Sequence, residues 1–429
     1  MELSGWGRFP RVDAQVAFPA DPAACARAIT LTQTIPRGLG RAYGDSALAD
    51  DVIAMRGLDR FHAFDPTTGL LSCDAGVSLD EILTLFVPRG WFLSVSPGTR
   101  FVTVGGAIAS DVHGKNHHVD GTFGDHVTAI DLLLGNGDIV RIGPDAQPDL
   151  FHATCGGMGL TGVILSATIR LKPIRSSLIR ETTVKSRDLD SILAAFETHG
   201  SATYSAAWID CLARGRNLGR SLLMLGEHAD EGPLTPRTRP PRAIPFDMPP
   251  GLLNHATGKA FNALFYARGP STVRTRTIPY EPHFYPLDGL AEWNRLYGRP
   301  GFVQYQFVLP SAVGLRQILE AIATSGEGAF LAVLKQFGPA NRNLLSFPTE
   351  GYTLALDFKA EPAVFALLDR LDHMVLDLGG RLYLAKDARM SEAMFKASYP
   401  NWQAFQEVRA RHHAIGRFAS HQSKRLGLI

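Results

Sequence analysis

Two glycine-rich segments near the start of the chain constrain its fold more than any other feature. The first, Pro36 to Ser46, reads PRGLGRAYGDS, and the second, Pro97 to Gly114, reads PGTRFVTVGGAIASDVHG. Glycine lets a backbone approach a phosphate closely and point several N–H groups at it, which makes an anion-binding concavity. The first segment has the spacing G-x-G-x-x-x-G without a clear strand-turn-helix context, so it does not predict a Rossmann fold. One such loop alone serves turn formation as readily as binding, and the presence of both segments favours binding.

The first 175 residues carry the pattern of a compact α+β domain. A helix is predicted over Ala23–Ile29, and a second helix, capped by Ser78, runs to Leu85. Asn136-Gly137 between two apolar runs predicts a hairpin. Alternating apolar residues predict a half-buried strand over Gly162–Leu171. Further strands are expected at Val52–Met55, Phe61–Phe64 and Leu70–Cys73, and a helix at Gln147–Thr154.

A second region of mixed α and β type follows. Strands are expected at Ser205–Asp210, Leu222–Leu225, Val303–Leu309, Leu331–Gln336 and Thr353–Phe358, and helices at Leu189–Phe196, Ser311–Thr324 and Pro362–Leu378. Residues 231–250 include seven prolines and too few apolar side chains to offset the entropy of ordering, so we expect a mobile loop there. This loop is either a solvated insertion or a flap over the site.

Length and composition set the class of protein. A chain of 429 residues predicts two domains and can bury a large core. The net charge of +2 gives no concentrated cationic field, which argues against nucleic-acid binding. Cys25, Cys73, Cys155 and Cys211 are far apart in sequence, so neither a disulfide framework nor a zinc site is expected. The chain shows neither a signal peptide nor an apolar run of about 18 residues. We therefore expect a cytoplasmic protein without an integral membrane segment, and peripheral contact with the inner membrane stays open.

The glycine-rich segments resemble the PCMH-type FAD-binding domain of the vanillyl-alcohol-oxidase family. The resemblance rests on the two segments above and on a third glycine-rich tract, Gly156 to Ile164. In that family two small α+β subdomains hold the ADP and pyrophosphate between them. The resemblance therefore implies an α+β fold with such an FAD-binding domain beside a substrate, or cap, domain built on a mixed sheet. The implied boundaries are 1–175 for the FAD domain, 176–380 for the substrate domain, and 381–429 for a segment that returns to the FAD domain.

The resemblance is strongest to one branch of the family, the decaprenylphosphoryl-β-D-ribose 2′-oxidases. It extends from Trp6 to the C-terminus except for residues 212–280. The tracts that carry it are Gly5–Arg8, Asp111–His118, Ser205–Trp208, Glu292–Arg295, Phe302–Phe307 and Gly380–Asp387. Thr353 and Ala355 depart from the branch, whose closest members carry an asparagine and a cysteine at these places.

The resemblance also implies which residues bind and react. It places FAD against Pro36, Arg37, Gly38, Leu39, Gly40, Arg41, Ala42, Tyr43, Gly44, Asp45, Ser46, Gly98, Thr103, Val104, Gly105, Gly106, Ser110, Asp111, Val112, His113, Ile164 and Tyr383. It places the substrate against Lys115, Trp208, Gln304, Gln306, Lys335 and Lys386, and gives catalytic roles to Lys386, His113 and Tyr43. Relatives with covalently attached flavin carry a histidine where this chain has Tyr43, so we expect non-covalent FAD.

Several of these side chains also have a purely structural interpretation. Lys386 follows an apolar run, Leu382–Ala385, that reads as a strand. Its amine is therefore either desolvated, which lowers the pKa, or paired with Asp357 or Asp387. Trp208 suits the core as well as ligand stacking.

The two glutamines and the histidine cluster can also be interpreted in more than one way. Gln304 and Gln306 alternate with apolar residues, so both amides point to one face of the sheet. Two neutral amides on one face suit hydroxyl recognition, although an exposed polar face would look the same. The spacing of His113, His117 and His118 fits no standard metal motif, so no metal is expected.

The implied reaction is FAD-dependent oxidation of a secondary sugar hydroxyl to a ketone. The implied substrate is a pentose on a polyprenyl phosphate, a precursor of cell-wall arabinan, and an NAD-dependent reductase would act on the keto product. Val112 is stiff and β-branched where oxidases of this superfamily often carry a small residue, so we expect a quinone or another carrier, rather than oxygen, to be the acceptor. Two alternatives stay open: an alditol or aldonolactone oxidase acting on a free sugar, and a flavin-binding protein without catalysis.

Overall fold

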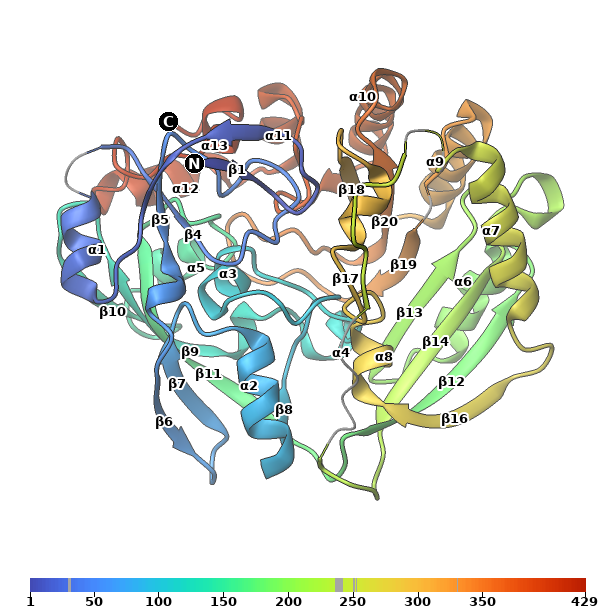
Figure 1. Ribbon diagram of the computed structural model, residues 1–429, viewed down its shortest axis with the longest axis horizontal. Coiled ribbons are helices and arrows are strands. Elements are labelled where there is room, and N and C mark those ends of the chain that lie inside the picture. Colours follow the sequence, from blue (N-terminus) through green and yellow to red (C-terminus); the bar gives the residue numbers. More distant parts are fainter. Residues whose placement is uncertain (30–31, 236–241, 250, 252, 330) are drawn as a thin grey trace.

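The computed structural model describes residues 1–429 except 30–31, 236–241, 250, 252 and 330 (Figure 1). After the strand pair β1 (Glu2–Ser4) and β2 (Arg11–Asp13), the chain forms a three-stranded parallel sheet of order β3-β5-β4. Its strands are β3 (Gln15–Ala17), β4 (Ile35–Arg37) and β5 (Asp51–Ala54), and α1 (Pro22–Ile29) connects β3 to β4. The helix predicted here is confirmed. Because β4 ends at Arg37, the first glycine-rich segment leaves the sheet at the end of this strand.

A six-stranded antiparallel sheet follows, with the order β10-β9-β11-β7-β6 and with β8 paired to β11. Its strands are β6 (Phe61–Asp65), β7 (Leu70–Asp74), β8 (Trp91–Leu93), β9 (Val127–Leu133), β10 (Ile139–Ile142) and β11 (Val163–Pro173). The predicted hairpin joins β9 to β10, and Gly137 in its turn has a φ of +93°. The predicted helix α2 (Leu79–Phe86) begins at Ser78, which forms a capping box with Glu81. The predicted helix α5 (Pro148–Thr154) is also present.

The middle of the chain forms an eight-stranded sheet of order β16-β12-β14-β13-β19-β20-β18-β21. Its strands are β12 (Leu178–Ser186), β13 (Tyr204–Ile209), β14 (Ser221–His228), β16 (Arg274–Pro279), β18 (Phe302–Leu309), β19 (Ala332–Phe337), β20 (Gly351–Lys359) and β21 (Arg381–Leu382). All five predicted strands are confirmed, whereas β12 and β16 were not predicted. The expected mixed sheet is antiparallel at every pairing. The predicted helices α6 (Leu189–Thr198), α9 (Ala312–Ser325) and α10 (Pro362–Asp377) pack on this sheet (Figure 1).

The chain returns to the first two sheets after β21. Helices α11 (Glu392–Ser398), α12 (Trp402–Arg411) and α13 (His421–Arg425) lie beside the N-terminal elements (Figure 1). Arg425 forms ion pairs with Asp45 at 2.6 Å and with Asp387 at 3.0 Å. The C-terminal segment therefore fixes the end of the first glycine-rich segment.

The strand expected over Leu382–Ala385 is wrong beyond Leu382. The backbone N–H groups of Lys386 and Asp387 both donate to the carbonyl of Tyr383, at 2.9 and 3.0 Å. These bonds form a helical turn, and the turn rather than a strand directs the Lys386 side chain.

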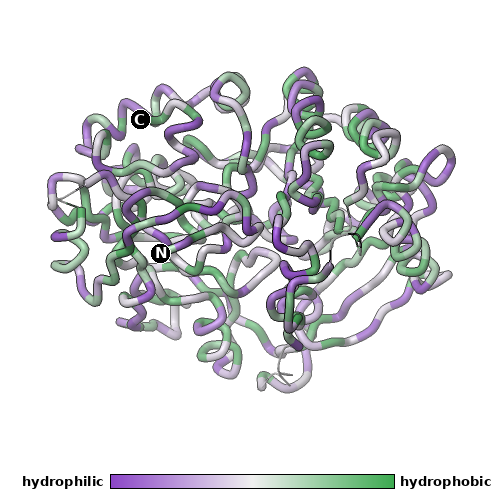
Figure 2. The backbone as a smooth tube through the Cα atoms, turned by 45° about the horizontal axis from the view of Figure 1, so that its top comes forward, coloured by the Kyte–Doolittle hydropathy of each residue, from purple (hydrophilic) through white to green (hydrophobic). Residues whose placement is uncertain are grey.

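The remaining expectations concern loops, cysteines and membrane spans. Residues 236–241 and 250 of the loop expected to be mobile lie outside the described residues. Within the rest of the loop, Arg242–Ala243 form β15, which pairs with β17 (Leu290–Ala291). All four cysteines are buried free thiols. Hydrophobic and hydrophilic residues are interspersed along the backbone (Figure 2), and no helix in the described part of the chain is long and apolar enough to cross a membrane.

Candidate functional site

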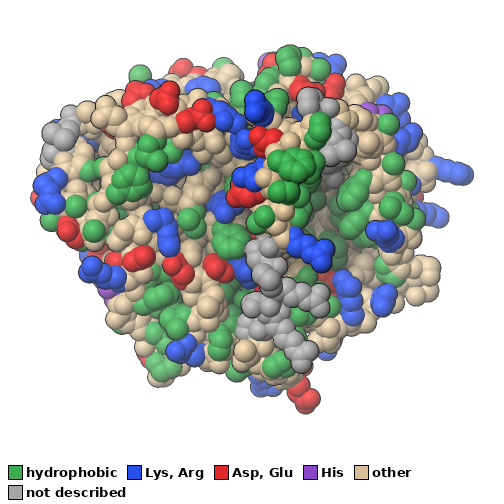
Figure 3. Space-filling model, viewed as in Figure 1, with side chains coloured by type: hydrophobic (Ala, Val, Ile, Leu, Met, Phe, Trp, Pro, Cys, Tyr) green, Lys and Arg blue, Asp and Glu red, His purple; other side chains and the backbone are tan. Residues whose placement is uncertain are grey.

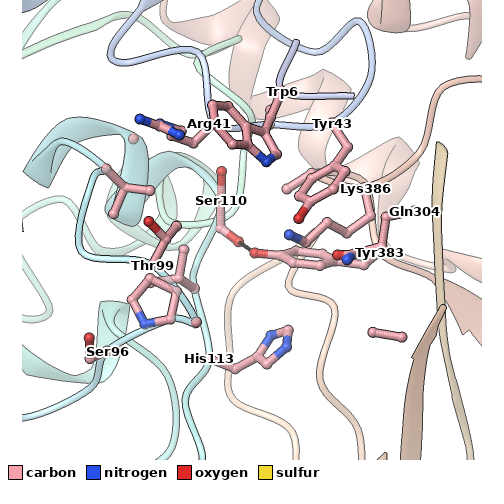
Figure 4. Close-up of a pocket in the computed structure, with 18 of the residues that line it drawn as sticks. Trp6, Arg41, Tyr43, Ser96, Thr99, Ser110, His113, Gln304, Tyr383 and Lys386 are labelled. Carbon is pink, nitrogen blue, oxygen red and sulfur yellow. Dashed lines mark hydrogen bonds between the residues drawn. The ribbon is translucent and has the colours of Figure 1, made fainter. Parts of the chain in front are cut away.

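A cavity of about 550 Å³ lies between the glycine-rich segments and the eight-stranded sheet. Backbone of residues 36–43 and 96–99 forms part of one wall, and side chains of β13, β18 and β19 form the other. Figure 4 shows Tyr43, His113 and Lys386 converging on it. The volume suits a cofactor or a small ligand.

The first glycine-rich segment offers backbone N–H groups to this cavity. Within the described residues, the N–H groups of Gly38 to Ala42 have no protein acceptor. Gly40 has a φ of +64°, a conformation that favours glycine. The Arg37 guanidinium holds the loop in place by donating to the carbonyls of Ser4 at 2.6 Å and Ala47 at 3.1 Å. Such a run of free donors suits a phosphate.

The two glycine-rich segments pack directly on each other. A Cβ added at Gly38 would come within 2.3 Å of Thr103 Oγ1, so a larger residue does not fit there. Thr103 caps α3 (Val104–Ala109) by accepting the N–H of Gly106 at 3.1 Å. A Cβ added at Gly98, in contrast, would meet no protein atom within 4 Å. The segments thus form one backbone-lined cradle, which fits the pyrophosphate of FAD.

Most residues expected to contact the cofactor line this cavity: Pro36, Arg37, Gly38, Leu39, Gly40, Arg41, Ala42, Tyr43, Ser46, Gly98, Thr103, Gly105, Gly106, Ser110, Val112, His113, Ile164 and Tyr383. Gly44, Asp45 and Val104 lie behind it. Gly44 packs against the backbone of Asp387, Asp45 is bound to Arg425, and the side chain of Val104 is fully buried in the core.

Asp111 also lies outside the cavity lining, although it precedes two residues that face the cavity. Its carboxylate is fully buried and accepts hydrogen bonds from the backbone N–H of Gly124 at 3.0 Å and from three side chains. Those three donors are Asn341 at 2.9 Å, Asn343 at 2.8 Å and Ser346 at 2.6 Å. Asp111 therefore fixes the backbone that presents Val112 and His113, and it ties that backbone to the loop before β20.

All six residues expected to contact the substrate line the same cavity: Lys115, Trp208, Gln304, Gln306, Lys335 and Lys386. The two amides of β18 do share one face of the sheet. Gln304 Nε2 donates to Asp357 Oδ1 at 2.5 Å, and Gln306 Nε2 lies 3.2 Å from Thr353 Oγ1. The Trp208 ring lies 4.7 Å from the Phe265 ring.

Three of these residues bring ammonium groups into the cavity. Burial lowers the pKa of Lys115 to about 8 and of Lys386 to about 8, while nearby carboxylates oppose each shift. Burial also lowers the pKa of Lys335 to about 7, assisted by the charges of the other two lysines. In the described part of the chain, the lysines in ion pairs are others: Lys172, Lys359, Lys396 and Lys424. The cavity therefore carries positive charge that no carboxylate pairs with directly.

His113 is held in its neutral form. Burial lowers its pKa well below the usual value, and the charge of Lys335 adds to this shift. Gln306 Nε2 lies 3.0 Å from His113 Nε2. Because an amide nitrogen can only donate, His113 Nε2 is the acceptor of this hydrogen bond. The described residues contain no cluster of His, Cys, Asp and Glu able to hold a metal ion.

Tyr43 and Lys386 lie against each other at the edge of the cavity. The Lys386 Nζ is 4.0 Å from the centre of the Tyr43 ring, a cation–π contact. Burial raises the pKa of Tyr43 well above its usual value, so the phenol stays protonated. Tyr383, from the turn that carries Lys386, donates its hydroxyl to the Ser110 carbonyl at 2.8 Å (Figure 4).

The sequence indicates Asp357 only as an ion-pair partner of Lys386, and within the described residues the two side chains form no ion pair. It is fully buried, lies opposite Gln304 in the β18–β20 ladder, and has its pKa raised by burial to about 7. The Lys386 charge opposes that shift. The alternation of β18 and β20 could have indicated this pairing.

Several further residues of the cavity were not expected. They include Trp6, whose ring lies 4.0 Å from the Arg41 guanidinium, and Phe261, Phe265 and His283. Trp6 lies in a tract that carried the resemblance, so its role was open to prediction. Phe261 and Phe265 fall in the part of the chain that could not be aligned, and nothing in the sequence marked them.

Comparison with known proteins agrees with this geometry. Residues 14–143 match the family model described as "FAD binding domain". The whole chain is 40% identical over 452 residues to decaprenylphosphoryl-beta-D-ribose oxidase of Mycolicibacterium smegmatis, 97% of which is covered. An uncharacterised protein of Streptomyces coelicolor is 35% identical over 82% of this chain and all of that protein. Human delta(24)-sterol reductase is 31% identical over 36% of this chain and 29% of its own length.

Proposed function

Because the chain belongs to the family of FAD-dependent oxidoreductases that includes decaprenylphosphoryl-β-D-ribose oxidase, we propose that it oxidises a pentose carried on a polyprenyl phosphate. The group oxidised is a secondary hydroxyl, and the product is a ketone. One observation carries the proposal. The cavity sets two amides and three lysine side chains, which form no ion pair among the described residues, opposite a backbone cradle for FAD. Amides suit sugar hydroxyls, and ammonium groups suit a phosphate.

In this proposal the two glycine-rich segments, together with Tyr383 and His113, would hold FAD. Residues 1–175 and 381–429 form the FAD-binding domain, and residues 176–380 form the substrate domain. The first boundary is supported by the sheets, since the chain passes from the six-stranded to the eight-stranded sheet between β11 and β12. At the second boundary, β21 still pairs with β18, and the chain leaves the eight-stranded sheet after it. Bound FAD supplies the redox chemistry by accepting the hydride that the carbinol carbon releases.

The side chains of the cavity transfer the proton, position the base and bind the substrate. Lys386 takes the hydroxyl proton, because a pKa of about 8 keeps its amine form accessible near neutral pH. Tyr43 and Asp357 hold Lys386 in position, the first by ring contact and the second by charge. Gln304 and Gln306 bind the other sugar hydroxyls, and Lys115 and Lys335 neutralise the phosphate.

Anaerobic flavin bleaching tests the proposal. FAD-loaded protein is mixed with a pentose on a polyprenyl phosphate dispersed in detergent, with a free alditol or aldonolactone, or with no substrate. Bleaching by the lipid-linked sugar alone is the expected result. Bleaching by the free sugar alone would indicate an alditol or aldonolactone oxidase. No bleaching with any compound would favour a flavin-binding protein without catalysis. Identity over the whole chain favours the first outcome.

FAD is expected to be bound without a covalent bond. Tyr43 stands where relatives with covalent flavin carry a histidine, and a phenol that burial keeps protonated does not readily form the flavin 8α bond that imidazole forms. Acid precipitation of the protein should release all of the yellow colour into the supernatant. Colour that stays with the washed precipitate would contradict this expectation.

We also propose that a quinone reoxidises the enzyme and that an NAD-dependent reductase consumes the keto product. Val112 lines the cavity and is held by backbone hydrogen bonds to Ala107 at 3.0 Å and from Phe123 at 2.8 Å. Its stiff, branched side chain cannot swing aside to admit oxygen. Val112→Gly should therefore react faster with oxygen than the wild type, as measured by stopped-flow mixing of reduced protein with air-saturated buffer. The rate with a soluble quinone serves as the control and should change little. An unchanged rate of reaction with oxygen in Val112→Gly would contradict the proposal that Val112 blocks the access of oxygen.

A further inference from the structure

Helix α7 (His255–Arg268) turns a polar face inward and an apolar face outward. Its buried residues are Gly258 and Asn262, and Asn262 donates to Asp210 at 2.8 Å. Its large apolar side chains point away from the core: Phe261 is 50% exposed, Leu264 52% and Phe265 36%. A surface helix of a soluble domain ordinarily places its apolar stripe against the core. The reversed arrangement indicates that this stripe has a partner outside the chain.

The outward stripe is continuous with the interior of the cavity. Phe261 and Phe265 line the cavity as well as the surface, and their rings are stacked with centres 5.8 Å apart. The Phe265 ring lies 4.7 Å from the Trp208 ring on β13. An apolar path therefore leads from the substrate wall to the exposed face of α7.

Positive charge surrounds this stripe. Among the described residues of 232–280, the single acidic residue, Asp247, is paired with Arg8 at 2.5 Å, and Arg276 is paired with Glu181 at 2.8 Å. The exposed cations that form no ion pair there are Arg242, two on α7 (Lys259 and Arg268), and Arg274 on β16. Figure 3 shows hydrophobic side chains gathered where α7 lies, with Lys and Arg side chains at their margin. Exposed Phe and Leu side chains beside a basic rim are typical of helices that lie in the interface of an anionic bilayer.

We propose that α7 docks on the surface of an anionic lipid bilayer through Phe261, Leu264 and Phe265. Its apolar side chains enter the acyl boundary, and the surrounding cations face the lipid headgroups. The mouth of the cavity then opens toward the bilayer, so an amphiphilic substrate passes from the membrane to the active site along Phe261 and Phe265. Docking stands on exposure and charge alone, whereas substrate delivery rests on the proposed function.

Vesicle cosedimentation tests the docking. FAD-loaded protein is incubated with vesicles of phosphatidylcholine alone or mixed with phosphatidylglycerol, without substrate. Binding to the mixed vesicles only is expected, and raised salt should weaken it. Lys259→Glu combined with Arg268→Glu should lower the binding constant at least ~10-fold, and Leu264→Ser by about 3-fold to 10-fold. These three residues lie outside the cavity lining, so bleaching by detergent-dispersed substrate should persist.

Ile139→Ser is the matched control. Ile139 lies on β10, far from α7 in Figure 1, and is 52% exposed, as Leu264 is. Its substitution should leave vesicle binding unchanged. Equal binding to neutral vesicles, or an equal loss in the control, would overturn the proposal. So would light scattering that shows a dimer broken by Leu264→Ser, because the stripe would then be an interface between copies. Vesicle binding is measured without substrate turnover. The docking proposal can therefore fail while the proposed sugar oxidation is supported, and the proposed oxidation can fail while docking is supported.

Discussion

Lys386→Met is expected to fold, bind FAD, and reduce its flavin at least ~100-fold more slowly than the wild type. Methionine keeps much of the length of the lysine side chain but cannot accept the hydroxyl proton. Only the chemical step should change, because Lys386 lies in a turn fixed by backbone hydrogen bonds to Tyr383. Anaerobic stopped-flow absorbance with saturating substrate measures the rate directly.

Lys359→Met provides the control for this variant. Lys359 ends β20, lies outside the cavity lining, and pairs with Glu361 at 3.5 Å. Its rate should stay close to that of the wild type. A folded, FAD-loaded Lys386→Met protein with an unchanged rate would move the proton transfer to His113 or Lys335.

The pH dependence of flavin reduction shows whether Lys386 acts as the neutral amine or as the ammonium ion. The amine form of Lys386 accepts the proton, and its pKa is about 8. The wild-type rate should therefore rise as the pH increases through about 8 and level off above it. Lys386→Met should lack this step. A wild-type rate that falls over the same range would mean that the ammonium form acts, as a donor to the developing alkoxide.

Much of the fold was open to prediction because local signals agreed with the tertiary structure. Ser78 and Glu81 stand three residues apart before an apolar run, and they form the capping box of α2. Asn136-Gly137 can make only a few turns, and it makes the β9–β10 hairpin. The glycine-rich cradle was predictable for the same reason, since its conformation depends on residues adjacent in sequence.

The rest depends on contacts between distant residues. Lys386 follows residues that read as a strand, but the carbonyl of Tyr383 closes a turn there instead. Asp357 reaches the site only through its position opposite Gln304 across two strands. Helix α7 escaped prediction because its apolar residues face outward, so its pattern indicates no face against the core. Its Asn254 capping box was a usable signal that was missed.

Lys335→Met is expected to raise the free energy of unfolding of the substrate-free protein by on the order of 1–4 kcal/mol near pH 6. Burial lowers the pKa of Lys335 from 10.5 to about 7, so the folded protein loses a proton that the unfolded chain retains. This cost is present in full below pH 7 and disappears as the pH approaches 10.5. The advantage of Lys335→Met should therefore shrink by ~1.4 kcal/mol for each pH unit over that range.

Urea unfolding of FAD-loaded proteins at about pH 6 and about pH 9.5 measures this difference. Lys359→Met, whose lysine is half-buried and paired, should show neither the gain nor the pH trend. A Lys335→Met protein that is less stable than the wild type at both pH values would mean that the ammonium stabilises the fold. The stabilised variant should also bind the phosphorylated substrate more weakly, with a raised KM. A binding lysine is expected to lower stability when no ligand is present, and an anionic ligand should restore that stability when it binds. A structural lysine would instead have an ion-pair partner within the chain.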